Sequence, residues 1–463
     1  MIMRDKTVAE RSDSSGSHSR RRYLKAIAGT TVVSGLAGCQ DGESSGSSGG
    51  SSANNDGGTA GSGGSTSSGG NEADLAFAHF VTLENDTWKT FVKGLKDATN
   101  HFGLGFSTAT HGGSQTQDIQ AIDSAIAKDA DIIMGTPFQD SGVRPVAEKM
   151  VDNGIPYTEY YSMAKWYTPL DAGPEFMLYS IPEVVRTGRY TAEVLFDAMG
   201  GSGNFVVLAG PSGHVGTNRI EGALQAAEER SDIQQIGDEI NGDWTRPSGR
   251  KSMSDFISKF GDDIDGVYAN NDGMALGAMS ILEDNNMSVP VVGYDSFQET
   301  AETIKRGKRG DSQPWFAGSF YARAYWQAGY AVVRSLDWLN GYRPEAPERM
   351  MWGGGSVVVN DPSEYDDLDA DIISADQYLN TIWSDDSSPY DWDLMSRTTG
   401  DGWDPQNELV PIRKKEFSQL NWTENNKPDG YSLPDVYDDS SLFDEVDKKL
   451  SEKYRKNPFA TDE

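Results

Sequence analysis

The fold is decided by residues 266–295, which read GVYANNDGMALGAMSILEDNNMSVPVVGYD. A short apolar run at 266–269 precedes a segment of helical period at 274–284, and a second apolar run follows at 289–293. Short apolar runs bounded by turn residues are typical of buried strands. The order strand, helix, strand therefore predicts a parallel unit with a right-handed crossover.

The same alternation extends over most of the chain on both sides of this unit. We expect strands at 75–81, 103–110, 131–135, 155–160, 177–181, 205–209, 233–240, 266–269 and 289–293. We expect helices between them at 86–102, 116–128, 143–153, 218–229, 253–260, 274–284 and 299–305. Strands alternating with helices of about 10–15 residues imply parallel sheets that are covered by helices on both faces.

The alternation falls into two runs, which predict two doubly wound α/β lobes joined by hinge crossovers. We assign residues 73–181 and about 320–355 to the first lobe and residues 182–319 to the second. The strand at 316–321 and the helix at 324–339 come after the second run, so we expect both to return to the first lobe. Residues 356–383 are left open as a further part of the second lobe.

Polar and aromatic residues follow the predicted strands, where open α/β sheets bind their ligands. These residues are Glu84, Asn85, Trp88, Thr136, Tyr161, Ser162, His214, Arg219, Asp243, Trp244, Asn271, Asp272, Tyr294 and Asp295. Aromatic rings stack on the C–H face of a sugar, while amides, carboxylates and guanidinium groups pair with its hydroxyls. Taken singly, each has a plainer explanation, such as core packing for the tryptophans or a helix N-cap for Asn271.

Several of these residues stand in motifs that resemble those of one family. Residues 271–278, NDGMALGA, resemble the NDxMALGA motif of type I periplasmic, ribose-binding-protein-like sugar-binding proteins. Residues 291–295, VVGYD, resemble the VVGFD strand of that family, and residues 219–222 resemble its RxxGF motif. Residues 322–329, ARAYWQAG, are similar to its AQxPYQMG return segment, and the resemblance covers about 74–376.

The resemblance implies a sugar site between two closing lobes, with no catalytic residue, cofactor or metal. Its implied ligand contacts are Asn85, Trp88, Arg219, Trp244, Asn271 and Asp295, with Thr136 and Tyr161 as looser matches. Arg323 replaces the glutamine of the return segment, and Tyr161-Ser162 replaces an aspartate–arginine pair. A neutral pentose or hexose and a sugar acid paired with Arg219 and Arg323 therefore both stay open.

The first 72 residues carry an export signal and a tether. Residues 19–25, SRRRYLK, match the twin-arginine export pattern, and an apolar segment at 26–38 is too short to span a bilayer. Residues 36–39, LAGC, resemble a lipobox, which makes Cys39 the lipidated first residue of the mature chain. Residues 39–72 then form a flexible leash, because 21 of the 30 residues at 41–70 are Gly or Ser. We expect a lipid-anchored protein on the extracellular face of the cell membrane.

The composition excludes several other classes of protein. Lys and Arg number 40 against 71 Asp and Glu, and the formal net charge of −31 argues against nucleic acid as a partner. A single cysteine excludes an internal disulfide, and the five histidines show no metal-ligand spacing. The acidic residues are scattered and form no EF-hand pattern, so they indicate a surface adapted to high salt rather than a calcium store. We expect a halophilic, archaeal source.

Residues 384–463 lie beyond the resemblance and form an acidic C-terminal extension. This segment holds Trp392, Trp403 and Trp422 and ends in an expected helix at 442–454. Aromatic residues at this density predict that the extension packs on the body. Of the three glycosylation sequons, at Asn85, Asn286 and Asn421, the last is the favoured glycan site.

These observations predict a monomeric substrate-binding lipoprotein whose partners are a sugar and the transmembrane subunits of an ABC permease. A secreted glycoside hydrolase is one alternative, but candidate carboxylates such as Glu84 and Asp295 fall on opposite lobes. No GxSxG elbow between a predicted strand and helix, no P-loop and no HExxH motif occurs in the sequence. A sugar-sensing receptor subunit on the same fold is the other alternative.

Overall fold

The computed structural model describes residues 73–84, 86–211, 213–308, 310, 312–368, 370–384, 388–400, 402 and 409–454. The predicted signal at 1–38, the tether at 39–72, Cys39, Asn85 and Trp403 lie outside these residues. None of the helices in the described ranges is both long and apolar enough to cross a membrane.

The first lobe is built on a sheet that has seven strands within the described residues, in the order β15-β12-β5-β4-β3-β1-β2. All neighbours pair in parallel except β12 and β15, which are antiparallel. Its strands are β1 (Leu75–Phe80), β2 (Gly105–Thr110), β3 (Ile132–Gly135), β4 (Tyr157–Tyr160), β5 (Phe176–Pro182), β12 (Met350–Gly353) and β15 (Leu409–Pro411). Its helices are α2 (Asp86–His101), α3 (Gln115–Ala127), α4 (Gln139–Asn153), α5 (Pro169–Ala172), α11 (Ala324–Leu339), α13 (Trp392–Met395) and α14 (Ser440–Tyr454).

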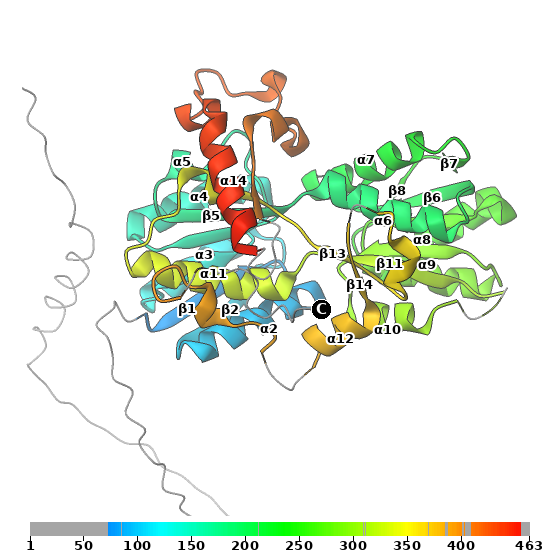
Figure 1. Ribbon diagram of the computed structural model, residues 1–463, viewed down its shortest axis with the longest axis horizontal. Coiled ribbons are helices and arrows are strands. Elements are labelled where there is room, and N and C mark those ends of the chain that lie inside the picture. The colour runs from blue at the N-terminus through cyan, green and yellow to red at the C-terminus, as the bar shows by residue number, and fades with distance from the viewer. Residues whose placement is uncertain are drawn as a thin grey trace, which may run out of the picture. The chain divides into compact units, whose positions relative to one another are not determined.

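The second lobe is built on a sheet that has eight strands in the described part of the chain, in the order β14-β13-β11-β10-β9-β6-β7, with β8 beside β6. Its strands are β6 (Gly203–Ala209), β7 (Ile233–Gln235), β8 (Ile240–Asn241), β9 (Gly266–Ala269), β10 (Pro290–Tyr294), β11 (Trp315–Tyr321), β13 (Ser356–Val359) and β14 (Asp371–Ser374). Its helices are α6 (Val184–Ala198), α7 (His214–Glu228), α8 (Arg246–Phe260), α9 (Asp272–Asp284), α10 (Gln298–Arg306) and α12 (Ala375–Ile382). Helices cover both faces of each sheet, which confirms the predicted fold class of two doubly wound α/β lobes (Figure 1).

The predicted return of strand 316–321 to the first lobe is wrong. This strand is β11, which pairs in parallel with β10 and antiparallel with β13, both of the second lobe. Its apolar residues are buried on both faces, and that pattern does not reveal which sheet receives the strand. The helix after it, α11, does pack on the first lobe, against α2. The chain therefore passes between the lobes at 182–184, 321–324 and 353–356.

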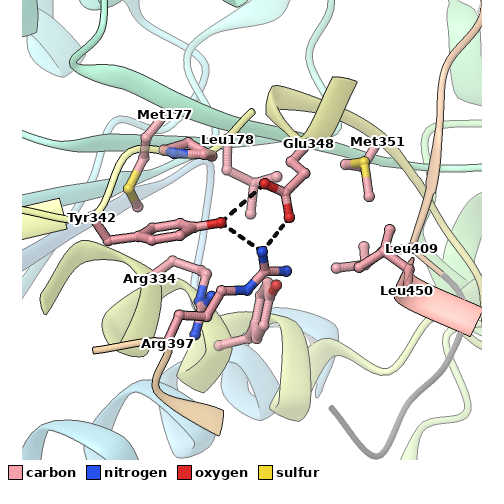
Figure 2. A pocket seen from close by; sticks show the side chains of 11 residues that line it. Met177, Leu178, Arg334, Tyr342, Glu348, Met351, Arg397, Leu409 and Leu450 are labelled. Atoms are coloured by element: carbon pink, nitrogen blue, oxygen red, sulfur yellow. Dashed lines mark hydrogen bonds and ion pairs between the residues drawn. The ribbon is translucent and has the colours of Figure 1, made fainter. Parts of the chain in front are cut away.

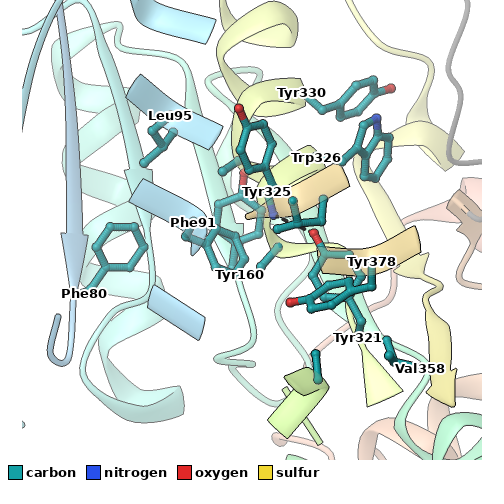
Figure 3. Packing of buried hydrophobic residues seen from close by; sticks show 14 of the residues in the cluster. Phe80, Phe91, Leu95, Tyr160, Tyr321, Tyr325, Trp326, Tyr330, Val358 and Tyr378 are labelled. Atoms are coloured by element: carbon teal, nitrogen blue, oxygen red, sulfur yellow. Dashed lines mark hydrogen bonds between the residues drawn. The ribbon is translucent and has the colours of Figure 1, made fainter. Parts of the chain in front are cut away.

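Buried aromatic rings continue from the first lobe toward these crossovers. Phe91 of α2 packs against Tyr160 of β4 with ring centroids 5.0 Å apart. At the end of β11, Tyr321 meets Tyr378 of α12 edge-on at 4.8 Å. Figure 3 shows both pairs among the aliphatic side chains of the same cluster. A pair of packed rings therefore lies next to the crossover at 321–324.

The described part of the C-terminal extension packs on the first lobe. β15 pairs with β12 at the edge of the sheet, and the Trp392 side chain is fully buried beside α11. Farther on, Trp422 stacks on Trp166, with ring centroids 5.5 Å apart. The helix expected at 442–454 is α14, Ser440–Tyr454.

The close packing of α2 on α11 depends on Gly94. A Cβ atom at this position would lie 2.0 Å from the carbonyl oxygen of Tyr325, so only glycine allows the two backbones to approach this closely. We expect Gly94→Ala to lower the free energy of unfolding by about 1–3 kcal/mol in chemical denaturation. Lys96→Ala, on the exposed face of the same helix, is the control and should change it by less than about 0.5 kcal/mol. Equal unfolding midpoints for the two variants would contradict this packing.

Candidate functional site

The first lobe contributes an aromatic wall to the candidate site. Trp88 lies in the first turn of α2, directly after β1, and packs on Phe80 and Phe91 with centroid distances of 5.1 and 5.5 Å. Tyr161 follows β4 and meets the Trp88 ring edge-on at 5.8 Å. Both rings therefore lie at the carboxyl end of the first sheet, where the sequence predicted them.

The second lobe contributes a buried guanidinium. Arg219 in the second turn of α7 is only 5% exposed. Its Nη1 donates to the carbonyl oxygen of Asn270 at 2.5 Å, and its guanidinium lies over the Tyr294 ring, 4.0 Å from the centroid. The Tyr294 hydroxyl is in turn 3.1 Å from that of Tyr268. The orientation of Arg219 is thus set by a carbonyl and an aromatic face.

Asn271 joins the loops that follow β8 and β9, which both pair with β6. Its Oδ1 accepts from the amide of Met274 at 3.0 Å, so it is the N-cap of α9. Its Nδ2 donates to the carbonyl oxygen of Trp244 at 2.9 Å. The Trp244 ring covers Gly210, where a Cβ atom would lie 2.0 Å from the indole. The capping role and the position at the site are therefore compatible.

Asp295 lies near groups of both lobes. It follows β10, and its carboxylate faces Arg219 and Asn271 of its own lobe and the Thr87 hydroxyl of the first lobe. Burial raises the pKa of Asp295, while these three groups oppose the rise. Burial also raises the pKa of the Tyr161 hydroxyl, with Asp295 adding to the rise and Arg219 opposing it. Tyr161 of the first lobe thus lies within electrostatic reach of both Asp295 and Arg219 of the second.

A second carboxylate supports the turn that carries Asp295. Asp272 is fully buried and accepts from the Ser319 hydroxyl at 2.7 Å and from the Phe297 amide at 2.8 Å. Burial and the neighbouring Asp295 raise the pKa of Asp272 well above its usual value. Asp272 therefore positions the 295–297 turn from inside the lobe.

Four of the candidate residues have backbones at positive φ. The φ angle is 68° at Tyr161, 67° at Trp244, 99° at Asp295 and 52° at Arg323. Such a conformation costs about 1–3 kcal/mol for a residue other than glycine and is often found at functional sites. The strain is consistent with side chains that are held in position for a ligand.

Six predicted residues are connected to one another by these contacts, whereas two others are engaged elsewhere. The six are Trp88, Tyr161, Arg219, Trp244, Asn271 and Asp295. Thr136 is buried, and its hydroxyl donates to the Tyr160 carbonyl at 2.9 Å. Arg323 lies at the second crossover, where it pairs with Asp371 and donates to the Ser356 hydroxyl at 3.1 Å. Asn85 lies outside the described residues.

The sequence did not identify Thr87 or the role of Tyr294. Tyr294 is one of the residues predicted to lie at the end of a strand, but only the structure shows that its ring lies under Arg219. Thr87 lies in the same turn of α2 as Trp88, and no pattern distinguishes it from a solvent-exposed threonine. Within the described ranges, no three His, Cys, Asp or Glu side chains gather as a metal site would require.

Comparison with known proteins points to one family. A family model described as the periplasmic binding protein domain matches residues 77–338. A xylitol-binding protein of Mycolicibacterium smegmatis is 31% identical over 49% of this chain, and the match spans 62% of that relative's length. A ribose import binding protein of Bacillus subtilis is 22% identical over 52% of this chain and 75% of its own.

Solved structures show the same fold. A twin-arginine translocation pathway signal protein from Burkholderia phytofirmans superimposes with a TM-score of 0.57 at 24% identity, covering 63% of this chain and 91% of its own. A solute-binding protein of an ABC transporter from Actinobacillus succinogenes, with bound D-allose, gives a TM-score of 0.56 at 23% identity and covers 63% and 99%.

His214, the first residue of α7, makes the stability of the fold sensitive to acid. Its Nδ1 lies 3.2 Å from Nδ2 of Asn218, and burial lowers its pKa to about 4. Since an unfolded histidine titrates near pH 6.5, neutral His214 contributes stability above that pH, and this contribution is lost as the pH falls toward 4. Between pH 7 and 4 we expect the native chain to lose up to about 3 kcal/mol more unfolding free energy than His214→Gln. Parallel pH profiles in denaturant titrations would contradict this assignment.

Proposed function

The chain belongs to the periplasmic binding protein domain family, and on this basis we propose that it holds a neutral sugar or related polyol between its two lobes for an ABC importer. The observation that carries the proposal is the cluster around Asp295. This carboxylate lies near Arg219 in the second lobe and near Thr87 and Tyr161 in the first. A ligand held there contacts both lobes, and a ligand that binds the closed arrangement better than the open one drives closure.

The chemistry of the cluster suits a ring or chain of hydroxyl groups. The rings of Trp88 and Tyr161 offer apolar faces and edges to C–H groups. The Asp295 carboxylate accepts from hydroxyl groups, and the Arg219 guanidinium donates to them. We assign these four residues, with Trp244 and Asn271, as the ligand contacts.

Charge favours a neutral ligand over a sugar acid. Arg323 is one of the two arginines that were candidates to bind a sugar acid, and it forms an ion pair with Asp371. The other, Arg219, faces Asp295. Because a carboxylate already lies near each guanidinium, a ligand carboxylate would meet the charge of Asp371 or Asp295 as well as that of the arginine. Xylitol, ribose and allose, named for three similar proteins, carry no charge at neutral pH.

We further propose that the protein is a monomeric lipoprotein, exported by the twin-arginine pathway and anchored through Cys39 on the extracellular face of the membrane. This assignment rests on the motifs at 19–25 and 36–39. The similar Burkholderia phytofirmans protein, itself described as a twin-arginine translocation pathway signal protein, supports the export route. The transmembrane permease is the proposed partner, and the protein acts by binding without chemical change to the sugar.

Tryptophan fluorescence and calorimetry with a ligand panel test the proposed binding. The panel pairs neutral pentoses, hexoses and pentitols with the corresponding sugar acids. We expect a neutral member to bind at micromolar or lower Kd and to change the emission of Trp88 or Trp244, and we expect its acid counterpart to bind more weakly. Tighter binding of the acids would refute the neutral assignment, and no response to any member would refute the sugar site.

Asp295→Asn tests the role of the central carboxylate. The substitution keeps the shape of the side chain but removes the charge that accepts hydroxyl protons, so we expect the Kd of the best ligand to rise about 10- to 100-fold. Glu299→Gln is the matched control, because Glu299 lies on the exposed surface of α10 and pairs with Arg246. The assignment is wrong if the two variants bind with the same Kd.

A further inference from the structure

The C-terminal part of the chain connects the two lobes a fourth time, beyond the end of the family match at residue 338. α12 packs on α10 and β14 of the second lobe, and its Tyr378 hydroxyl donates to the Ser296 carbonyl at 2.5 Å, directly beside Asp295. The next described helix, α13, packs on α11 of the first lobe. The chain therefore crosses from the second lobe to the first between Ile382 and Trp392.

A first-lobe lysine holds the start of this crossing. The Lys93 ammonium on α2 donates to the carbonyl oxygens of Ile382 at 2.8 Å and Ser384 at 3.1 Å. It also lies over the Trp383 ring, 5.9 Å from the centroid. A cation at a helix C-terminus satisfies free carbonyl groups and interacts favourably with the helix dipole. Lys93 of one lobe thus caps a helix of the other.

The far side of the crossing is fixed firmly to the first lobe. Trp392 is fully buried, and its Nε1 donates to the Asp97 carboxylate of α2 at 2.8 Å. Arg397 pairs with Glu348 and donates to the Tyr342 hydroxyl at 2.5 Å (Figure 2). The space between these residues and their apolar neighbours is about 20 Å³, roughly one water molecule. The contact region around Arg397 is therefore filled by side chains and is not a ligand pocket.

The extension then contacts the second lobe again. The short helix η4 (Lys414–Leu420) is held on the first lobe, where Phe417 meets Trp166 and Glu416 accepts from Nε1 of Trp352 at 3.2 Å. The carbonyl oxygen of Gln419 in the same helix accepts from Nδ2 of Asn218 at 2.5 Å. Asn218 immediately precedes Arg219 in α7. An element fixed to the first lobe is thereby bonded next to a candidate ligand residue of the second.

We propose that the described segments 382–384, 388–400 and 409–420, together called the strap, hold the two lobes together before any ligand binds. The Lys93 contacts and the Asn218 contact join first-lobe elements to second-lobe elements, so moving these elements apart requires breaking them. The strap therefore shifts the free protein toward the closed arrangement and slows ligand release. The effect on release rests on the proposed function, whereas the effect on the lobes does not.

The distance between the lobes in sugar-free protein tests the strap. Spin labels at Lys128→Cys in the first lobe and Lys251→Cys in the second, both exposed positions, report this distance in a Cys39→Ser background. We expect a single narrow distribution without the strap substitutions. With Lys93→Met and Asn218→Ala together, the mean distance should lengthen by more than the width of that distribution. Lys414→Met is the matched control, since its partner Asp438 also lies in the extension.

Identical distributions for the parent and the double variant would overturn the proposal. If the double variant fails to fold, Lys93→Met alone carries the same prediction with a smaller shift. When a sugar from the panel binds, we expect release from the double variant to be about tenfold faster. Failure of every sugar to bind would contradict the proposed function while leaving the sugar-free distances to decide on the strap.

Discussion

The site depends on the buried guanidinium of Arg219. A charge taken out of water is expensive unless it is paired and hydrogen-bonded, and removal of one partner leaves an uncompensated charge. The Asn270 carbonyl, the Tyr294 ring and the Asp295 carboxylate together provide the compensation. Each of these groups comes from the carboxyl end of a neighbouring strand, so the electrostatics of the site require the parallel order of β9 and β10.

The same constraint explains the strained backbone around the site. Asp295 lies near Arg219 on a turn with φ 99°, and Asp272 and Ser319 hold that turn from inside the lobe. In the first lobe, Tyr161 also has a positive φ, and its ring packs against Trp88. Arg219 and Asp295 in one lobe and the two rings in the other are therefore preorganised for a ligand. Preorganisation reduces the conformational entropy that is lost on binding.

Much of the fold and about two thirds of the candidate site could be predicted from local patterns. The hydrophobic periodicity predicts the helices and strands that have a clear pattern. The rule that open α/β sheets bind ligands beyond the carboxyl ends of their strands identifies Trp88, Arg219, Asn271 and Asp295. The destination of β11 could not be predicted, because a strand that is apolar on both faces fits either sheet. The engagement of Arg323 with Asp371 depends on a pairing 48 residues along the chain. The hydroxyl of Thr136 turns to a backbone carbonyl, which strand-end position alone does not reveal.

The central claim is that a neutral sugar or polyol binds between the two lobes. A crystal structure with the most tightly bound member of the ligand panel is its most direct test. We predict a neutral polyhydroxyl ligand between the lobes, against Trp88 and Tyr161 on one side and hydrogen-bonded to Arg219 and Asp295 on the other. A ligand bound at any other place, or one that contacts a single lobe only, would contradict it.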